Sequence, residues 1–325
     1  MFQRYLILWL IASSLFSLKW PDWFGDAVDP FALSKLYLSY LITLTMFCVG
    51  CLLPPDELKQ VFRRWPTIVF GTCVQYLSMP ALAYSMAILF DLDRADKIGV
   101  IIVGVVPGAM ASNVLTMTAR GNVSYSVSLT TLATLLSPIV VPLGLWLLLG
   151  ADLPMPPGDV AWKLFLEVVL PVMCGYAICR LWSDFERLSL KFAPAIANGI
   201  ILWIIAVVVA LNRDRITEIS SKTLLALLLV NVLGYLAGYY AAGAIRLPRK
   251  MRRTLSIEVG MQNAGLGTSL AISLFPDLPG ATIPTATYTF GCMLTATILA
   301  WYWSLRDPED PVADGAQVKS TRGSE

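Results

Sequence analysis

SIEVGMQNAG, residues 256–265, is a polar, glycine-containing stretch inside a segment that is otherwise apolar enough to cross a membrane. It continues into leucine, alanine and isoleucine residues as far as Phe275. A carboxylate and two amides cost free energy in lipid, and glycine weakens a helix. Their concentration within ten residues indicates that a membrane helix is interrupted here for a functional reason.

The composition of the chain is that of a polytopic membrane protein. Of its 325 residues, 57% are hydrophobic and 14% are charged, whereas soluble domains carry about 25% charged residues. Apolar stretches of membrane-spanning length recur along the sequence, with no soluble domain between them. The polar tail, residues 306–325, is expected to be cytoplasmic and disordered.

Several classes of site are excluded or disfavoured by the residues that the chain lacks. It has no histidine, which excludes histidine-ligated zinc and histidine proton relays. No Walker or dinucleotide-binding glycine pattern is present, so nothing indicates ATP-driven work, and a net charge of +2 gives no reason to expect nucleic acid as a partner. The six cysteines lie in apolar stretches and are expected to be buried free thiols; the Cys48-x-x-Cys51 spacing is a weak indication of redox or metal chemistry.

We predict an all-α membrane protein with ten transmembrane helices. Their expected bounds are 5–18, 36–53, 67–90, 98–118, 124–149, 161–181, 194–211, 224–245, 255–275 and 283–305. With a cytoplasmic N-terminus, twice as many of the 24 lysines and arginines fall inside as outside, so both termini are predicted to lie on the cytoplasmic side of the inner (plasma) membrane. The first segment also resembles a signal peptide, but no A-x-A cleavage site follows it, and we expect a retained helix.

The ten helices divide into two sets of five, residues 1–150 and 151–305, which would insert with opposite topology as an inverted repeat. The fourth helix contains GVVPGAMASN, residues 104–113, and the ninth contains the stretch quoted first. Pro107 removes one backbone hydrogen bond from the fourth helix. Interrupted helices at corresponding positions of two repeats indicate a transporter binding site; kinks made only for helix packing are the alternative.

Glu258 is the candidate for a ligand-binding charge, since it and Glu167 are the acidic residues that lie clearly inside predicted helices. No lysine or arginine lies deep in a span, so a proton or a metal cation would balance Glu258. One carboxylate with neutral oxygen ligands suits a singly charged ion better than Ca²⁺, and sodium is the candidate. The available side-chain ligands are Ser112, Asn113, Ser126, Thr130, Gln75 and Gln262.

Not every hydroxyl near these residues is expected to bind an ion. Ser126 and Thr130 are separated by four residues and share one face of the fifth helix. The usual role of a hydroxyl in a membrane helix is a hydrogen bond to a carbonyl of its own helix. That role is expected for most of the remaining hydroxyls of this helix, namely Ser124, Ser128, Thr131 and Thr134.

Two long motifs resemble the bile acid:sodium symporter family: PGAMASNVLT…ARGNVSYSVSLT, residues 107–130, and SIEVGMQNAGL, residues 256–266. The resemblance extends over all ten helices. It implies a panel domain of helices 1, 2, 6 and 7 and a core domain of helices 3–5 and 8–10. It also implies that helices four and nine unwind and cross near the membrane centre.

The resemblance further implies two sodium ions, bound as co-transported ligands that share Glu258. The first would be held by Ser112, Asn113, Ser126, Thr130 and Glu258. The second would be held by Gln75, Glu258, Gln262 and the backbone carbonyls of Val259 and Met261. The residues expected to contact substrate are Met110, Ala111, Asn113, Asn263, Cys292 and Met293.

Near the substrate the sequence departs from the family. Ala109 and Met110 stand where members often have glycine and threonine, and Cys292 and Met293 stand where some bacterial members have polar residues. The ion-binding residues are all of types that can ligate sodium. The departures therefore concern which substrate is carried rather than the coupling ion.

The sequence predicts a monomeric, sodium-coupled secondary symporter that imports an organic anion by alternating access. A bile-acid-like anion and a small acid such as pantoate or ketopantoate both remain open. A proton-coupled carrier, with Glu258 titrating alone, and a non-transporting substrate sensor are the alternatives. An enzyme is disfavoured, because neither histidine nor a pair of intramembrane carboxylates is present.

The predicted orientation places Lys250 and Ser320 in the cytoplasm. In a cysteine-free background, Lys250→Cys and Ser320→Cys should resist impermeant thiol reagents in intact cells and react after permeabilisation. Lys222→Cys, on the predicted outer side, is the matched control and should react in intact cells. Labelling of only one of the two cytoplasmic positions would contradict the count of ten helices.

Overall fold

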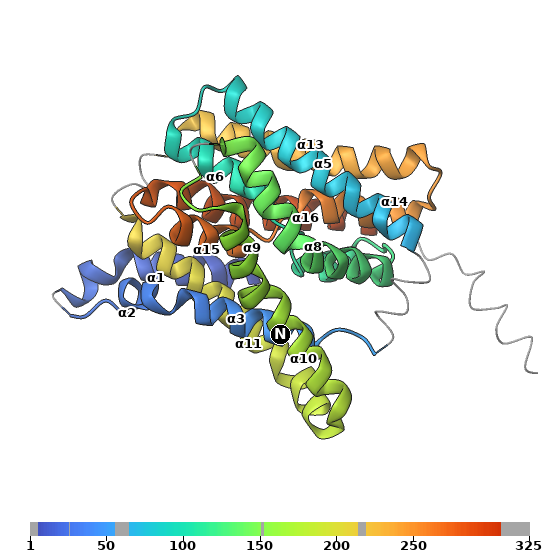
Figure 1. Ribbon diagram of the computed structural model, residues 1–325, viewed down its shortest axis with the longest axis horizontal. Coiled ribbons are helices and arrows are strands. Elements are labelled where there is room, and N and C mark those ends of the chain that lie inside the picture. The colour runs from blue at the N-terminus through green and yellow to red at the C-terminus, as the bar shows by residue number, and fades with distance from the viewer. Residues whose placement is uncertain (1–5, 26, 56–64, 151–152, 214–218, 307–325) are drawn as a thin grey trace, which may run out of the picture.

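The computed structural model describes residues 6–25, 27–55, 65–150, 153–213 and 219–306, and Figure 1 shows them as a bundle of helices. Within these ranges the regular secondary structure is helical, with one isolated β-bridge. Apart from residue 306, the predicted tail lies outside the described residues. The helices of the first half are α1 (Leu6–Phe24), α2 (Pro30–Leu33), η2 (Ser34–Tyr37), α3 (Leu38–Cys51), α5 (Trp65–Leu89), α6 (Arg94–Val105), α7 (Ala111–Thr118) and α8 (Val123–Leu149). Those of the second half are α9 (Pro157–Leu164), η4 (Phe165–Val169), α10 (Leu170–Leu181), α11 (Ser183–Leu211), α13 (Ser221–Ala244), α14 (Arg249–Gly260), α15 (Ala264–Leu274), η5 (Pro279–Ala281) and α16 (Thr282–Arg306).

Seven helices of the described residues are long and apolar enough to cross a membrane. They are α2–α3 with η2, α5, α8, α9–α10 with η4, α11, α13, and α16 with η5. The remaining predicted spans correspond to α1 and to the two interrupted helices, α6–α7 and α14–α15. A multi-pass membrane protein is therefore confirmed in outline, while the count of ten crossings stays a prediction.

Three predicted starts are wrong by six residues or more: the span predicted from Leu36 begins at Pro30, and the errors at α11 and α14 come from charged residues placed outside the helix. Helix α11 begins at Ser183 rather than at Pro194, because Asp184 and Glu186 in its first turn favour a helix N-terminus. Proline is accommodated inside this long helix. Helix α14 begins at Arg249 rather than at Leu255, so four of the basic residues assigned to the preceding loop lie in its first two turns.

Close backbone packing fixes α14 against α13. The α13 sequence GYLAG presents Gly234 and Gly238 to α14, the small-residue spacing that lets membrane helices approach closely. A Cβ atom at Gly238 would lie 2.4 Å from the carbonyl oxygen of Leu255, and one at Gly260 would lie 2.2 Å from the Tyr235 ring. The segment that carries Glu258 is therefore held rigidly by its neighbour.

The helices pack in two groups that lie at opposite sides of the bundle in Figure 1. Helices α1, α3, α10 and α11 contact one another, as do α5, α6, α8, α13, α14 and α16. One buried apolar cluster contains residues of both groups, including Ile42 of α3, Ile204 of α11, Ile102 of α6 and Leu145 of α8. Apolar side chains therefore form the contact between the two groups.

A polar contact joins the two groups at one end. Asn212, which follows α11, donates a hydrogen bond from Nδ2 to Thr282 Oγ1 of α16 over 2.8 Å, and both residues are buried. The next residue, Arg213, forms a 2.5 Å ion pair with Asp29 and donates to the carbonyl oxygen of Ser17. The end of α11 is thus tied to α1, to α2 and to α16.

The cysteines are free thiols, as predicted, but two of them are not buried. Cys73 and Cys174 are exposed on helix surfaces, where a cysteine behaves as one more small apolar side chain facing lipid. Cys48, Cys51 and Cys179 pack in one buried cluster. Among the described residues no group of three histidine, cysteine or carboxylate side chains is placed to hold a metal, so the C-x-x-C spacing does not form such a site.

Candidate functional site

The first helix break, between α6 and α7, follows from Pro107. A residue before proline is driven into extended conformation, and Val106 has φ −69° and ψ 155°. Helix α6 therefore ends at Val105, and α7 begins at Ala111. The glycine and alanine of the PGAM segment, residues 107–110, therefore lie between the two helices and are not helical.

The second break, between α14 and α15, follows Gly260. Met261 is extended, with φ −109° and ψ 102°. Asn263 then caps the new helix, because its Oδ1 accepts a 3.1 Å hydrogen bond from the Leu266 backbone N–H. Asparagine is among the preferred N-cap residues, which explains why the helix resumes at this position. Both predicted interruptions are thus observed.

The two breaks lie against each other and satisfy each other's backbone. The Ala109 N–H donates to the Met261 carbonyl over 3.0 Å, and the Asn263 N–H donates to the Pro107 carbonyl over 2.7 Å. Gly108 and Gln262 form an antiparallel β-bridge between these bonds. Freed backbone groups at membrane depth require such partners. The pairing joins segments about 150 residues apart in the sequence into one site.

Glu258 lies beside this crossing and is fully buried. Its Oε1 accepts hydrogen bonds from Ser112 Oγ, at 2.6 Å, and from Ser126 Oγ. Its Oε2 accepts a 2.9 Å hydrogen bond from Thr130 Oγ1. Three of the four side chains predicted to hold the first ion with Glu258 therefore contact its carboxylate directly.

These hydroxyl groups face more acceptors than they have protons. Ser112 Oγ lies 2.6 Å both from the Ala109 carbonyl oxygen and from Glu258. Thr130 Oγ1 lies 3.0 Å from the Ser126 carbonyl oxygen and 2.9 Å from Glu258. A hydroxyl carries one proton, so each can satisfy only one of its two neighbours. The cluster has a surplus of oxygen lone pairs around a single carboxylate.

No protein cation balances this charge within the described part of the chain. The ion pairs there involve other acidic residues. The second predicted intramembrane acid, Glu167, lies in the π-helical turn η4 with its carboxylate 3.7 Å from Lys163 Nζ. Buried charges are paired or bound to cations, so Glu258 needs a proton or a small cation.

The residues predicted for the second ion also lie together. Gln75 Nε2 donates to Gln262 Oε1 over 3.2 Å, and Gln262 Nε2 donates to the Val259 carbonyl over 3.1 Å. A Cβ atom at Gly108 would lie 3.1 Å from Gln75 Nε2 and 3.2 Å from Glu258 Oε2. Amide oxygens, one carboxylate and backbone carbonyls therefore converge at the crossing, and glycine at position 108 leaves them room.

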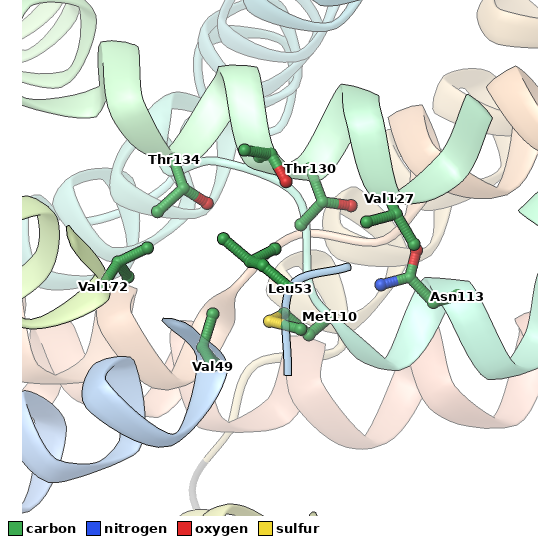
Figure 2. Close-up of a pocket in the computed structure, with 9 residues that line it drawn as sticks. Val49, Leu53, Met110, Asn113, Val127, Thr130, Thr134 and Val172 are labelled. Atoms are coloured by element: carbon green, nitrogen blue, oxygen red, sulfur yellow. The ribbon is translucent and has the colours of Figure 1, made fainter. Parts of the chain in front are cut away.

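Asn113 and Met110 face a cavity between the two helix groups. The cavity measures ≈ 10 Å³, about the room that one water molecule needs, so it is far too small for an organic substrate. Figure 2 shows Thr130 and Thr134 of α8 on one side of it and Val49 of α3 on the other. Asn113 Oδ1 is buried without a hydrogen-bond partner among the described residues. The lining residues are Val49, Leu53, Met110, Asn113, Val127, Thr130, Thr131, Thr134 and Val172.

The other residues predicted to contact substrate do not line this cavity in the conformation described. Ala111 packs partly buried beside the crossing, and Asn263 serves as the cap of α15. Cys292 is buried in α16, and Met293 packs against the adjoining apolar cores. Their substrate contacts stay a prediction.

Thr131 was missed by the sequence reasoning. Ser128 donates to the Ser124 carbonyl over 2.9 Å, as expected, but the buried Thr131 hydroxyl has no partner within the described residues. Thr131 lies four residues after Val127 and three before Thr134, so the three share a face of α8. That spacing distinguishes the residues of α8 that line the cavity from Ser126 and Thr130, whose hydroxyls face Glu258.

Comparison with known proteins gives several matches over most of the chain. A model described as the sodium bile acid symporter family matches residues 39–219. The uncharacterized sodium-dependent transporter YocS of Bacillus subtilis is 30% identical over 91% of this chain and 90% of its own length. The probable sodium/metabolite cotransporter BASS1 of Arabidopsis thaliana chloroplasts is 28% identical, over 93% and 74%. The human ileal sodium/bile acid cotransporter is 31% identical, over 74% and 70%.

Two neighbouring threonines test the hydrogen-bonding roles assigned above. Thr130→Val removes a hydroxyl bound to Glu258, so the unfolding temperature of the detergent-solubilised protein should fall, in line with the roughly 1.5–3 kcal/mol of a hydrogen bond to a charged group. Thr131→Val removes a hydroxyl without a partner and should leave that temperature unchanged or raise it. Equal losses in both variants, measured by thermal unfolding, would contradict the assignment.

Proposed function

Because this chain belongs to the sodium bile acid symporter family, a family of sodium-dependent membrane transporters, we propose that it imports an organic anion driven by the inward sodium gradient. The observation that carries this proposal is the surplus of acceptors around the buried Glu258. A cation can bind to those oxygen lone pairs of the cluster that accept no hydrogen bond. We propose that the protein works as a monomer in the inner membrane, with both termini in the cytoplasm.

The first sodium ion would be held by the Glu258 carboxylate and the hydroxyls around it. On binding, the Ser112 and Thr130 protons turn to the carbonyls already within reach, 2.6 Å away at Ala109 and 3.0 Å away at Ser126. Their lone pairs then face the ion. The unpaired Asn113 Oδ1 supports this site, since it is a buried acceptor that lacks a donor. The complete ligand set is Ser112, Asn113, Ser126, Thr130 and Glu258.

The second sodium ion would be held at the crossing of the two breaks. Its supports are the adjacency of Gln75 and Gln262 and the space that Gly108 leaves beside Glu258. The ligand set is Gln75, Glu258, Gln262 and the carbonyls of Val259 and Met261. Two sodium ions and one carboxylate leave a single positive charge, which a monovalent substrate anion neutralises. The charge balance thus favours joint transport of two ions with one anion.

The transport movement would separate the panel helices α1, α3, α10 and α11 from the core. Their mutual packing supports the panel, and the packing of α5, α6, α8, α13, α14 and α16 supports the core. Residues 1–150 and 151–305 would form the inverted repeats, with one break in each. Separating the groups breaks none of the ion pairs found among the described residues, and it enlarges the cavity at Met110 and Asn113.

The substrate would be an anion with an apolar body. Helix α7 directs its N-terminus into the crossing, and the N-terminus of a helix favours negative charge. Val49, Leu53 and Val172 supply apolar surface on the facing side. A bile-acid-like anion and a small acid such as pantoate or ketopantoate both meet this description. The alternatives are a proton-coupled carrier, with the proton on Glu258, and a substrate sensor. Uptake that requires sodium would support the proposal over both.

Glu258→Gln tests the shared carboxylate. The substitution keeps the shape of the side chain but removes the charge that balances both cations. Sodium chloride should raise the unfolding temperature of the wild type relative to choline chloride, since a ligand stabilises the state that binds it. The variant should elute as a folded protein and lose both this shift and sodium-driven uptake. Wild-type sodium affinity in the variant would refute the shared-carboxylate site.

Met110→Thr tests substrate choice. Methionine offers an apolar surface and only a weak acceptor, whereas threonine can donate to a polar anion. Since a hydrogen bond to a charged group is worth about 1.5–3 kcal/mol, relative uptake of taurocholate and pantoate should change by about tenfold or more, with the sodium activation curve nearly unchanged. Met117→Thr, at an exposed position of the same helix, is the control. An unaltered order of preference in competition assays would remove Met110 from the substrate site.

A further inference from the structure

The carbonyl of Gly260, the last residue of α14, is held by two side chains from other helices. Asn231 Nδ2 of α13 and the Tyr288 hydroxyl of α16 each donate to it over 2.8 Å. Asn231 is 2% exposed and Tyr288 is 1% exposed. The last carbonyls of a helix have no partner within the helix. Here the partners are buried protein groups on two separate helices.

The donors are themselves fixed by further hydrogen bonds. Asn231 Oδ1 accepts from Thr295 Oγ1 over 2.7 Å, which defines the orientation of the amide. The Tyr235 hydroxyl lies 3.0 Å from Thr295 Oγ1 and 3.2 Å from the Cys292 carbonyl oxygen, to which it donates. An amide that is hydrogen-bonded at both its oxygen and its nitrogen, as Asn231 is, has little freedom to rotate. Gly260 is therefore held in one place rather than merely capped.

The direction in which Gly260 points matters for its neighbours. Gly260 is the last residue of α14 and the backbone at Met261 is extended, so the carbonyl direction changes between these two residues. The Gly260 carbonyl points to α13 and α16, whereas the Met261 carbonyl meets the Ala109 N–H of the first break. The Val259 carbonyl meets the Gln262 amide at the same crossing. Holding the Gly260 carbonyl therefore fixes the place where α14 ends, between the Val259 carbonyl of the helix and the Met261 carbonyl of the extended backbone.

We propose that Asn231 and Tyr288 are positioning residues for the second sodium site. They hold the Gly260 carbonyl away from the crossing, and so they set the separation of the Val259 and Met261 carbonyls, which determines affinity for a cation and selection by its size. This inference rests on the proposed sodium-coupled function. Neither side chain touches the ion, so both act through the backbone.

The two buried tyrosines of the network give a matched test. Tyr288→Phe removes a hydroxyl bound to Gly260, and Tyr235→Phe removes one bound to Cys292 and Thr295. The measurement is the rise in unfolding temperature of the purified full-length protein with sodium or lithium chloride, relative to choline chloride. Tyr288→Phe should raise the half-saturating sodium concentration by about 2- to 10-fold, the effect of one net hydrogen bond. It should also change the ratio of sodium to lithium affinity.

Tyr235→Phe should leave both the half-saturating concentration and the ion ratio near those of the wild type. Asn231→Ser removes the other donor to Gly260 and should reproduce the effect of Tyr288→Phe. The inference can therefore still be tested if one of these two variants does not fold. A change in ion ratio distinguishes positioning from a general loss of stability, which would lower the unfolding temperature without altering selectivity.

Three results would overturn the inference. Wild-type sodium and lithium responses in both Tyr288→Phe and Asn231→Ser would remove the positioning role while leaving the sodium-coupled function in place. Equal shifts in Tyr288→Phe and Tyr235→Phe would assign the effect to the network as a whole rather than to Gly260. Absence of any sodium response in the wild type would instead refute the proposed function, and the inference with it.

Discussion

The buried carboxylate of Glu258 is the constraint on which the site depends. Hydroxyl groups surround it, but their protons are shared with backbone carbonyls, and no basic side chain among the described residues pairs with it. A charge in this position is tolerable only with a cation or a proton. In the proposed mechanism the two helix breaks serve the same need, because unwound backbone frees carbonyl oxygens that can bind a cation.

Within the described residues, a rigid group of helices that carries the proposed ion site meets the other helices at an interface with few polar contacts. Glycine contacts hold α14 against α13, and the Gly260 carbonyl is fixed by two buried donors. The facing helices meet this group mainly through apolar side chains, with the Asn212–Thr282 hydrogen bond at one end. Apolar surfaces slide and separate at lower cost than networks of buried polar groups. In the proposed mechanism the movement therefore occurs between the helix groups, and the ion ligands move as a unit.

The sequence predicted the breaks because proline, glycine and buried polar residues have direct backbone consequences. Pro107 forces extended backbone before it, and Asn263 starts a helix after it. It did not predict Thr131 or Asn231, because the neighbour that each face of α8 or α13 meets depends on how the helices pack, and the sequence alone does not give that packing. The early start of α11 was missed because charged residues were taken as a loop. The closed cavity, which depends on tertiary packing, also lies beyond what periodicity can show.

Helix α8 carries residues of both the proposed ion site and the proposed substrate cavity. Ser126 and Thr130 face Glu258, whereas Val127, Thr131 and Thr134 line the cavity. Adjacent residues of a helix differ in direction by about 100°, so the two sets of residues are neighbours, and Thr130 touches both. In the proposed mechanism an ion bound between Glu258 and Thr130 also holds in place part of the wall that a substrate meets. Apart from Thr130, residues that line the cavity can then differ in size and polarity without altering a proposed ion ligand.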